Sequence, residues 1–161
     1  MIVLVMGVSG AGKSTIGPAL AAALGWPCLD ADDYHPPENV AKMAAGTPLT
    51  DADRAPWLEK INRELRKQEA GGKSAVLCCS ALKEAYRKVL RSGIGDFRVV
   101  YLMGAPELIR RRIAGRQHRY MPASLLDSQL ATLEPPADAI ELNVAHSVEH
   151  NVAQAAAALQ A

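Results

Sequence analysis

Nine consecutive residues near the start of the chain carry the strongest chemical signal in the sequence. They are Gly7, Val8, Ser9, Gly10, Ala11, Gly12, Lys13, Ser14 and Thr15. They fit the pattern G-x-x-x-x-G-K-[ST], whose backbone N–H groups surround a phosphate while the lysine reaches the β- and γ-oxygens and the first hydroxyl can bind Mg²⁺. A plain turn between strand and helix would need neither Lys13 nor Ser14 at these offsets. We therefore expect the chain to bind a nucleoside triphosphate here.

The acidic residues after the second apolar run are the candidates for the rest of the chemistry. Many phosphate-loop proteins hold Mg²⁺ with an aspartate at the end of a neighbouring strand, but residues 75–79 contain none. Asp30 and Asp32 are the nearest pair. In an extended segment they would project to opposite sides, one toward metal-bound water and the other toward an acceptor hydroxyl. The alternative is that they cap a turn or helix, a role for which Asp33 is better placed.

Basic residues lie on the segments that flank this predicted phosphoryl-transfer site. They are Lys42, Arg54, Lys83 and Arg87. Each alone could be a solvated surface charge, but together they favour an anionic acceptor, because a carboxylate is best held by Arg and Lys donors. His35 follows the acidic segment, and it is either a site residue or a hydrogen-bonded structural histidine.

Short apolar runs that alternate with helical patterns indicate the fold. The predicted strands are residues 2–6, 27–30, 74–79, 97–103 and 139–144. The three middle runs are apolar on both faces, which favours a parallel sheet covered by helices on both sides. Ligands bind beyond the carboxyl ends of the strands in such a sheet. The polar residues that follow the strands should therefore meet at one edge.

The helical patterns lie between these strands. An Ala/Leu pattern over residues 13–24 is closed by Gly25, and residues 53–68 carry a stripe of apolar side chains at helical spacing. Asp51 is expected to cap the start of the second helix. The alanine-rich residues 147–159 predict a closing helix.

Composition predicts an ordinary globular protein. A chain of 161 residues, 49% of them hydrophobic and 22% charged, is expected to form one domain over residues 1–161. Its net charge of +1 argues against a nucleic-acid binder, although five arginines crowd into residues 110–119. No apolar run reaches membrane-spanning length and no cleavable leader is evident, so we expect no membrane partner and a cytoplasmic location. Cys78 and Cys79 are expected to be buried small residues in a reducing compartment.

Longer stretches of the sequence resemble the bacterial-type gluconate kinase family. Beyond the phosphate loop, the matching residues are the runs 30–36, 42–43, 46–58, 79–83, 86–87 and 128–134, together with Asn39. The block that ends at residue 58 and the run 79–83 are far more selective than the phosphate loop, which many enzymes share.

This resemblance implies both a fold and an activity. The fold would be a three-layer α/β phosphate-loop NTPase of the nucleoside-monophosphate-kinase type, with a five-stranded parallel sheet, helices on both faces and a mobile lid at about residues 112–132. The activity would be transfer of the ATP γ-phosphoryl group to the 6-hydroxyl of D-gluconate, with Mg²⁺, by a homodimer.

The residues would then take distinct roles. Lys13, Asp32 and Arg116 would be catalytic, with Arg112 and Arg116 of the lid closing over ATP. Ser14 would bind Mg²⁺ directly and Asp30 through water. The acceptor would contact Asp32, His35, Lys42, Arg54, Lys83, Arg87 and Gln129.

Departures from the family pattern and competing interpretations remain. Arg119 stands where members often carry a histidine, and Asn143 replaces an acid that is usual after the fifth strand. Shikimate kinase shares the loop and the Asp-x-Asp but has a triple glycine after the third strand, which residues 79–81 lack. A nucleoside monophosphate kinase would also fit the fold. A non-catalytic nucleotide switch is the alternative of another class, yet the Asn-Lys-x-Asp sequence of guanine-nucleotide switches is absent.

Overall fold

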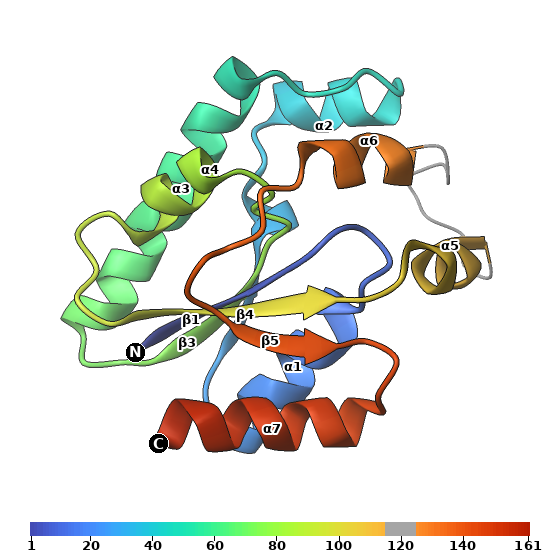
Figure 1. The fold of residues 1–161 in the computed structure, drawn as a ribbon. Helices are drawn as coiled ribbons and strands as arrows, with labels where there is room; N and C mark the ends of the chain where they lie inside the picture. Colours follow the sequence, from blue (N-terminus) through green and yellow to red (C-terminus); the bar gives the residue numbers. More distant parts are fainter. Residues whose placement is uncertain (115–124) are drawn as a thin grey trace.

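Five parallel strands form the central sheet, with helices on both faces (Figure 1). The computed structural model describes residues 1–114 and 125–161. The strands are β1 (Ile2–Met6), β2 (Cys28–Asp30), β3 (Ala75–Cys78), β4 (Phe97–Met103) and β5 (Ile140–Asn143), in the spatial order β2-β3-β1-β4-β5. The predicted parallel sheet is confirmed, and each predicted strand matches an observed one to within a residue at either end.

Helices connect successive strands along the chain. They are α1 (Lys13–Leu24), α2 (Pro37–Ala44), α3 (Asp51–Ala70), α4 (Glu84–Arg91), α5 (Pro106–Ala114), α6 (Leu125–Thr132) and α7 (Val148–Gln160), with a short 3₁₀ helix η1 (Ala31–Tyr34). None of them within the described residues is long and apolar enough to cross a lipid bilayer.

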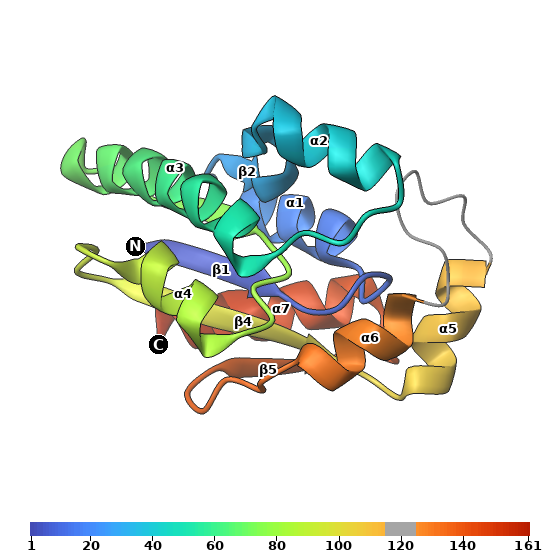
Figure 2. The same ribbon diagram turned by 90° about the horizontal axis from the view of Figure 1, so that it is seen from above.

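The sheet separates two apolar layers. Alternate residues of β1 point to opposite faces: Val3 and Val5 pack toward α1 and α7, whereas Ile2, Leu4 and Met6 pack toward α3 and α4. All five are 0% exposed. Figures 1 and 2 show the resulting three layers, with α1 and α7 on one side of the sheet and α3 and α4 on the other.

The edge strand β2 differs from its prediction. Its residues Cys28 and Asp30 are exposed, because β2 pairs with β3 alone. The expectation that this run is buried on both faces was therefore wrong, while β1 and β3 are fully buried. This exposure leaves the single carboxylate of β2, that of Asp30, open at the end of the strand.

Capping residues fix where the helices that carry the site begin. The predicted start of α1 at Lys13 is confirmed, and the preceding Gly12 takes a left-handed conformation at φ 102°. Helix α3 begins two residues before its prediction, and its cap is Thr50 rather than Asp51. The Thr50 hydroxyl accepts the Asp53 N–H while the Asp53 carboxylate accepts the Thr50 N–H, so this reciprocal pair satisfies the helix start.

Candidate active site

The phosphate loop follows β1 directly and ends in the first turn of α1. Gly10 and Gly12 have φ angles of 82° and 102°, a backbone that side chains with a β-carbon rarely adopt. A β-carbon on Gly10 would also lie 2.6 Å from Cγ1 of Ile113. The ammonium of Lys13 bends back over the loop and donates to the carbonyls of Gly7 at 2.9 Å and Val8 at 3.1 Å. Ser14 and Thr15 are exposed.

The predicted acidic pair lies within electrostatic range of this lysine. Desolvation lowers the pKa of Lys13, while the charges of Asp32 and Asp30 oppose that shift. Desolvation, and then the neighbouring carboxylate of Asp30, raise the pKa of Asp32, although the side chain itself is largely exposed. A carboxylate with a raised pKa is a stronger proton acceptor. The structure therefore brings Lys13, Asp30 and Asp32 together at the end of β1 and β2.

Asp30 also has a local structural role. Its Oδ1 accepts the backbone N–H of Asp32 at 2.9 Å, which caps η1. The expectation that Asp33 is the capping residue was wrong, because the cap forms at the residue before the 3₁₀ turn rather than within it.

His35 lies against a wall built from two buried residues. Its ring stacks on Trp57 with a centroid distance of 4.1 Å and an interplanar angle of 14°. Asn39, only 2% exposed, places Nδ2 3.3 Å from His35 Nδ1 and donates to the Asp53 carbonyl at 3.0 Å. Burial, followed by the charge of Arg54, lowers the pKa of His35 to about 4. The histidine is consequently neutral near pH 7 and can offer only a hydrogen bond.

Two of the predicted acceptor cations are bound to other parts of the protein. Lys42 donates to Asp53 Oδ2 at 2.8 Å, and this bond, with that from Thr50, lowers the pKa of Asp53 to about 2. Arg87 is 1% exposed. Its guanidinium donates to the carbonyls of Ala81 at 2.7 Å and Glu134 at 2.8 Å. This geometry does not support direct contact between Arg87 and an acceptor; the side chain instead joins α4 to two segments of the cleft.

The segment that Arg87 holds is conformationally unusual. Ala81 has φ 47°, the only positive value at a non-glycine residue among those that the structure describes. Left-handed backbone at such a residue is unfavourable and is retained where the surroundings enforce it. Arg87 supplies that constraint just beyond the carboxyl end of β3.

Arg54 and Lys83 both approach the carboxylate of Asp51, the first residue of α3. Arg54 Nη1 donates to the Leu49 carbonyl at 2.8 Å and to the Tyr86 hydroxyl at 3.3 Å. Lys83 Nζ lies 3.4 Å from the Asp51 carboxylate. Tyr86 and Asp51 had no assigned site role in the sequence analysis, because nothing in their spacing shows that α3 and α4 bring them together.

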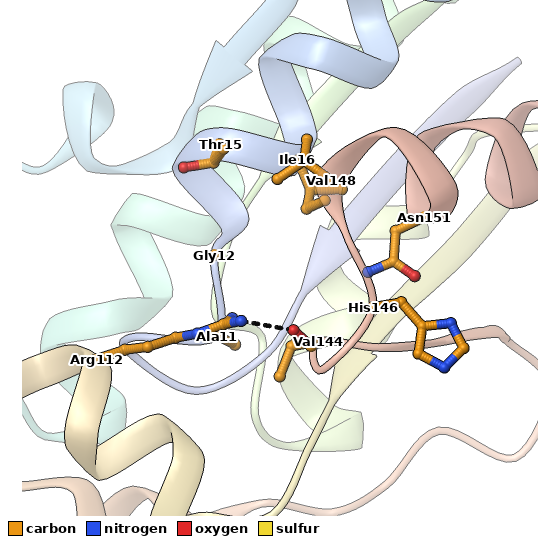
Figure 3. Close-up of a pocket in the computed structure, with 9 residues that line it drawn as sticks. All are labelled: Ala11, Gly12, Thr15, Ile16, Arg112, Val144, His146, Val148 and Asn151. Atoms are coloured by element: carbon orange, nitrogen blue, oxygen red, sulfur yellow. Dashed lines mark hydrogen bonds between the residues drawn. The ribbon is translucent and has the colours of Figure 1, made fainter.

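A cavity of about 260 Å³ adjoins the other side of the phosphate loop. Figure 3 shows Arg112 of α5 reaching across it to the loop after β5, where its Nη2 donates to the Val144 carbonyl at 2.6 Å. The remaining lining residues are Ala11, Gly12, Thr15, Ile16, His146, Val148 and Asn151. Its position beside Gly12 and Thr15 suits the nucleoside of a nucleotide whose phosphates lie on the loop.

Asn143, which departs from the family pattern, precedes the lining residue Val144 and binds another lining residue, Asn151. Its Oδ1 accepts the Ala145 N–H at 2.9 Å, and its carbonyl accepts the buried amide of Asn151 at 3.0 Å. The side chain that replaces the usual acid therefore stabilises the turn after β5.

Gln129 connects α6 to the phosphate loop. Its Oε1 accepts the Ser9 N–H at 2.7 Å. The predicted lid arginine Arg116 and the variant position Arg119 lie outside the described residues. Within the described range, the end of α5 and the whole of α6 fall inside the predicted lid of residues 112–132.

Known proteins are similar to this chain in both sequence and fold. Residues 2–136 match a family model described as an AAA domain. A gluconokinase of Gluconobacter oxydans is 50% identical over 135 residues, which cover 84% of this chain and 76% of that protein. This chain belongs to the gluconokinase family.

Solved structures agree with the gluconokinase assignment. A gluconokinase from Sinorhizobium meliloti has a TM-score of 0.86 and 43% identity, over 98% of this chain and 90% of that one. A sugar kinase from a Janibacter species reaches a TM-score of 0.91 and 42% identity, over 99% and 94% of the two chains. The predicted gluconokinase family and phosphate-loop kinase fold are therefore confirmed.

Proposed function

We propose that this chain transfers the γ-phosphoryl group of ATP to the 6-hydroxyl of D-gluconate, giving 6-phospho-D-gluconate and ADP. The observation that carries the proposal is the placement of Lys13 and Asp32 within mutual electrostatic range, next to a cluster of cations at the same edge of the sheet. The gluconokinases named above support gluconate as the acceptor.

Each side chain has a defined task in this reaction. The loop amides and Lys13 hold the phosphates, which requires Lys13 to leave the Gly7 and Val8 carbonyls. Asp32 accepts the proton of the 6-hydroxyl as its oxygen attacks the γ-phosphorus and the bond to the leaving ADP oxygen breaks. Neutral His35 and the pair Arg54 and Lys83 would bind the sugar acid, with Lys42 and Arg87 supporting the walls of the site.

The oxygen donors present suit Mg²⁺. In the described part of the chain, no three His, Cys, Asp or Glu side chains gather to hold a metal ion. Mg²⁺ characteristically uses one or two protein oxygens and takes the rest from water and phosphates. Ser14 would bind it directly and Asp30 through water, and the ion would neutralise phosphate charge.

Closure over ATP involves the region beside the cavity. Arg112 and Arg116 of the lid, about residues 112–132, would contact ATP and exclude water from the transfer. The bond between Gln129 and Ser9 N–H supports a coupling of this region to the phosphate loop. Gln129 would then exchange this contact for one to the acceptor.

The setting of the enzyme is part of the proposal. We expect a single kinase domain over residues 1–161, a homodimer and a cytoplasmic location. All three cysteines are free thiols, which is the usual state in a reducing compartment.

One assay tests the function. ADP release would be measured with gluconate, other aldonates, shikimate, AMP, glycerate and the neutral polyol sorbitol. Gluconate should exceed sorbitol by about 30-fold or more in kcat/KM, because a desolvated carboxylate held by cations contributes a few kcal/mol. Equal values for gluconate and sorbitol, or turnover with shikimate or AMP alone, would refute the proposal.

A further inference from the structure

The carboxylate of Asp51 links the start of α3 to α4 through a hydrogen bond and to two neighbouring cations through ion pairs. Tyr86, on α4 and 9% exposed, donates its hydroxyl to Asp51 Oδ1 at 2.5 Å. The same hydroxyl accepts from Arg54 Nη1 at 3.3 Å. The Tyr86 hydroxyl therefore accepts one hydrogen bond from Arg54 and donates another to Asp51, and this pair of bonds fixes its orientation.

Arg54 and Lys83 lie near one aromatic ring. The Arg54 guanidinium carbon is 5.5 Å and the Lys83 ammonium 5.6 Å from the centroid of Tyr86. Two cations this close to one ring repel each other unless an anion lies between them. Asp51 supplies that anion, at 3.8 Å from Arg54 Nη1 and 3.4 Å from Lys83 Nζ.

The lengths of these ion pairs separate the cations into two kinds. Lys42 is bound tightly to Asp53 at 2.8 Å, within the range of a charge-assisted hydrogen bond. The contacts of Asp51 with Arg54 and Lys83 are longer, and about a third of each cationic side chain is exposed. Lys83 can therefore turn toward an incoming carboxylate, and Arg54 can offer its remaining N–H groups while Nη1 stays on the Leu49 carbonyl and Tyr86 keeps its short bond to Asp51.

Helix capping does not account for the Asp51 side chain. The start of α3 is already satisfied by the reciprocal bonds of Thr50 and Asp53. The Asp51 carboxylate points instead to Tyr86 and Lys83 across the gap to α4.

We propose that Asp51 and the Tyr86 hydroxyl are positioning residues of the acceptor subsite, which hold Arg54 and Lys83 as one carboxylate-binding pair. This inference rests on the proposed function, since it concerns the sugar acid of that reaction. It adds two residues that act through the cations and not on the reacting atoms.

Steady-state kinetics of D51N and Y86F test this assignment. D51N should raise KM for gluconate about tenfold while KM for ATP stays within about twofold, because Arg54 and Lys83 lose the carboxylate that holds them in position for the acceptor. Y86F should raise KM for gluconate in the same direction by a smaller factor. D51E, which keeps the charge, should recover part of the loss.

Matched variants control for charge and for the hydroxyl. D96N removes one carboxylate beside Arg98, at the start of β4 and the opposite end of the sheet, and Y101F removes a phenol hydroxyl from the same apolar layer. Both should leave KM for gluconate within about twofold. Circular dichroism reports folding, and Y86F decides the question if D51N does not fold.

The outcomes separate this inference from the proposed function. A wild type that phosphorylates gluconate, with D51N and Y86F unchanged in KM or equally impaired toward ATP, would refute the positioning role alone. If another sugar acid is the acceptor, its KM replaces that of gluconate in the same comparison. Turnover confined to uncharged acceptors would refute both.

Discussion

Gly17 of α1 lies directly against the thiol of Cys78 in β3. A β-carbon added at position 17 would lie 2.0 Å from Cys78 Sγ, far inside van der Waals contact. The sulfur is held in place, since it donates to the Lys13 carbonyl at 3.4 Å and lies 3.8 Å from Cys28 Sγ. This contact sets how closely the helix that begins at Lys13 can approach the sheet.

Gly17→Ala should therefore destabilise the fold, although alanine normally favours a helix. We expect the free energy of unfolding to fall by about 1–3 kcal/mol, the usual cost of overpacking, and urea denaturation would measure it. The double variant G17A/C78A should be more stable than the two single effects predict, because the clashing sulfur is gone. Additive effects in this cycle would contradict the contact.

Lys13→Ala tests the phosphate loop. Turnover should fall by at least about 100-fold, corresponding to about 3 kcal/mol of lost transition-state stabilisation, because one preorganised electrostatic partner is removed. Lys73→Ala removes an exposed lysine before β3 and should leave kcat unchanged. A folded Lys13→Ala enzyme with near-normal kcat would show that the lysine does not contact the transferred group.

Asp32→Asn tests the proposed base. It should lower kcat by about 100-fold or more while calorimetry finds little change in Mg²⁺·ATP affinity. Asp33→Asn, an exposed neighbour, is the control. Collapse of ATP affinity would instead make Asp32 a metal residue.

The pH profile gives a second measure of Asp32. A base must be deprotonated to act, so kcat/KM should fall as pH falls through its pKa. Because desolvation and the neighbouring Asp30 carboxylate raise the pKa of Asp32, this acid limb should lie above the ordinary aspartate value of 3.8. A limb at or below that value would contradict the assignment.

His35 predicts a pH dependence of stability. Burial lowers its folded pKa from 6.5 to about 4, so between these values the unfolded chain binds the extra proton. The free energy of unfolding should therefore decrease as pH falls from about 6.5 to about 4. His35→Gln should flatten this slope in urea titrations, and His150→Gln, at an exposed position, should not. Parallel slopes for wild type and His35→Gln would show that the ring is not buried neutral.

Local sequence pattern predicted most of the fold. The phosphate loop, the strand β1 and the helix α1 follow from a short motif and from runs of apolar residues, so their bounds came out correctly. The cap of α3 did not, because Asp51 and Thr50 are both good capping residues and only the bonds with Asp53 distinguish them.

The acceptor side depends on contacts between distant segments. Residue type alone made Arg87 equivalent to Arg54, but the fold buries Arg87 on the inner face of α4 and leaves Arg54 partly exposed. The ring stacking of His35 and Trp57 likewise joins residues 22 positions apart, which no periodic pattern shows. Long-range packing therefore decides which basic residues can meet a ligand.

The central place of β1 has a consequence for synthesis of the protein. Ile2 of β1 pairs with Ala75 on one side and with Phe97 on the other, so β1 is completed only by strands that are made much later. Such pairing has high contact order and forms slowly. On the ribosome, the hydrophobic strand that supports the phosphate loop must wait, with at least one edge unpaired, until β4 has emerged. Nascent chains are thus open to chaperones and to aggregation until β3 and β4 have emerged.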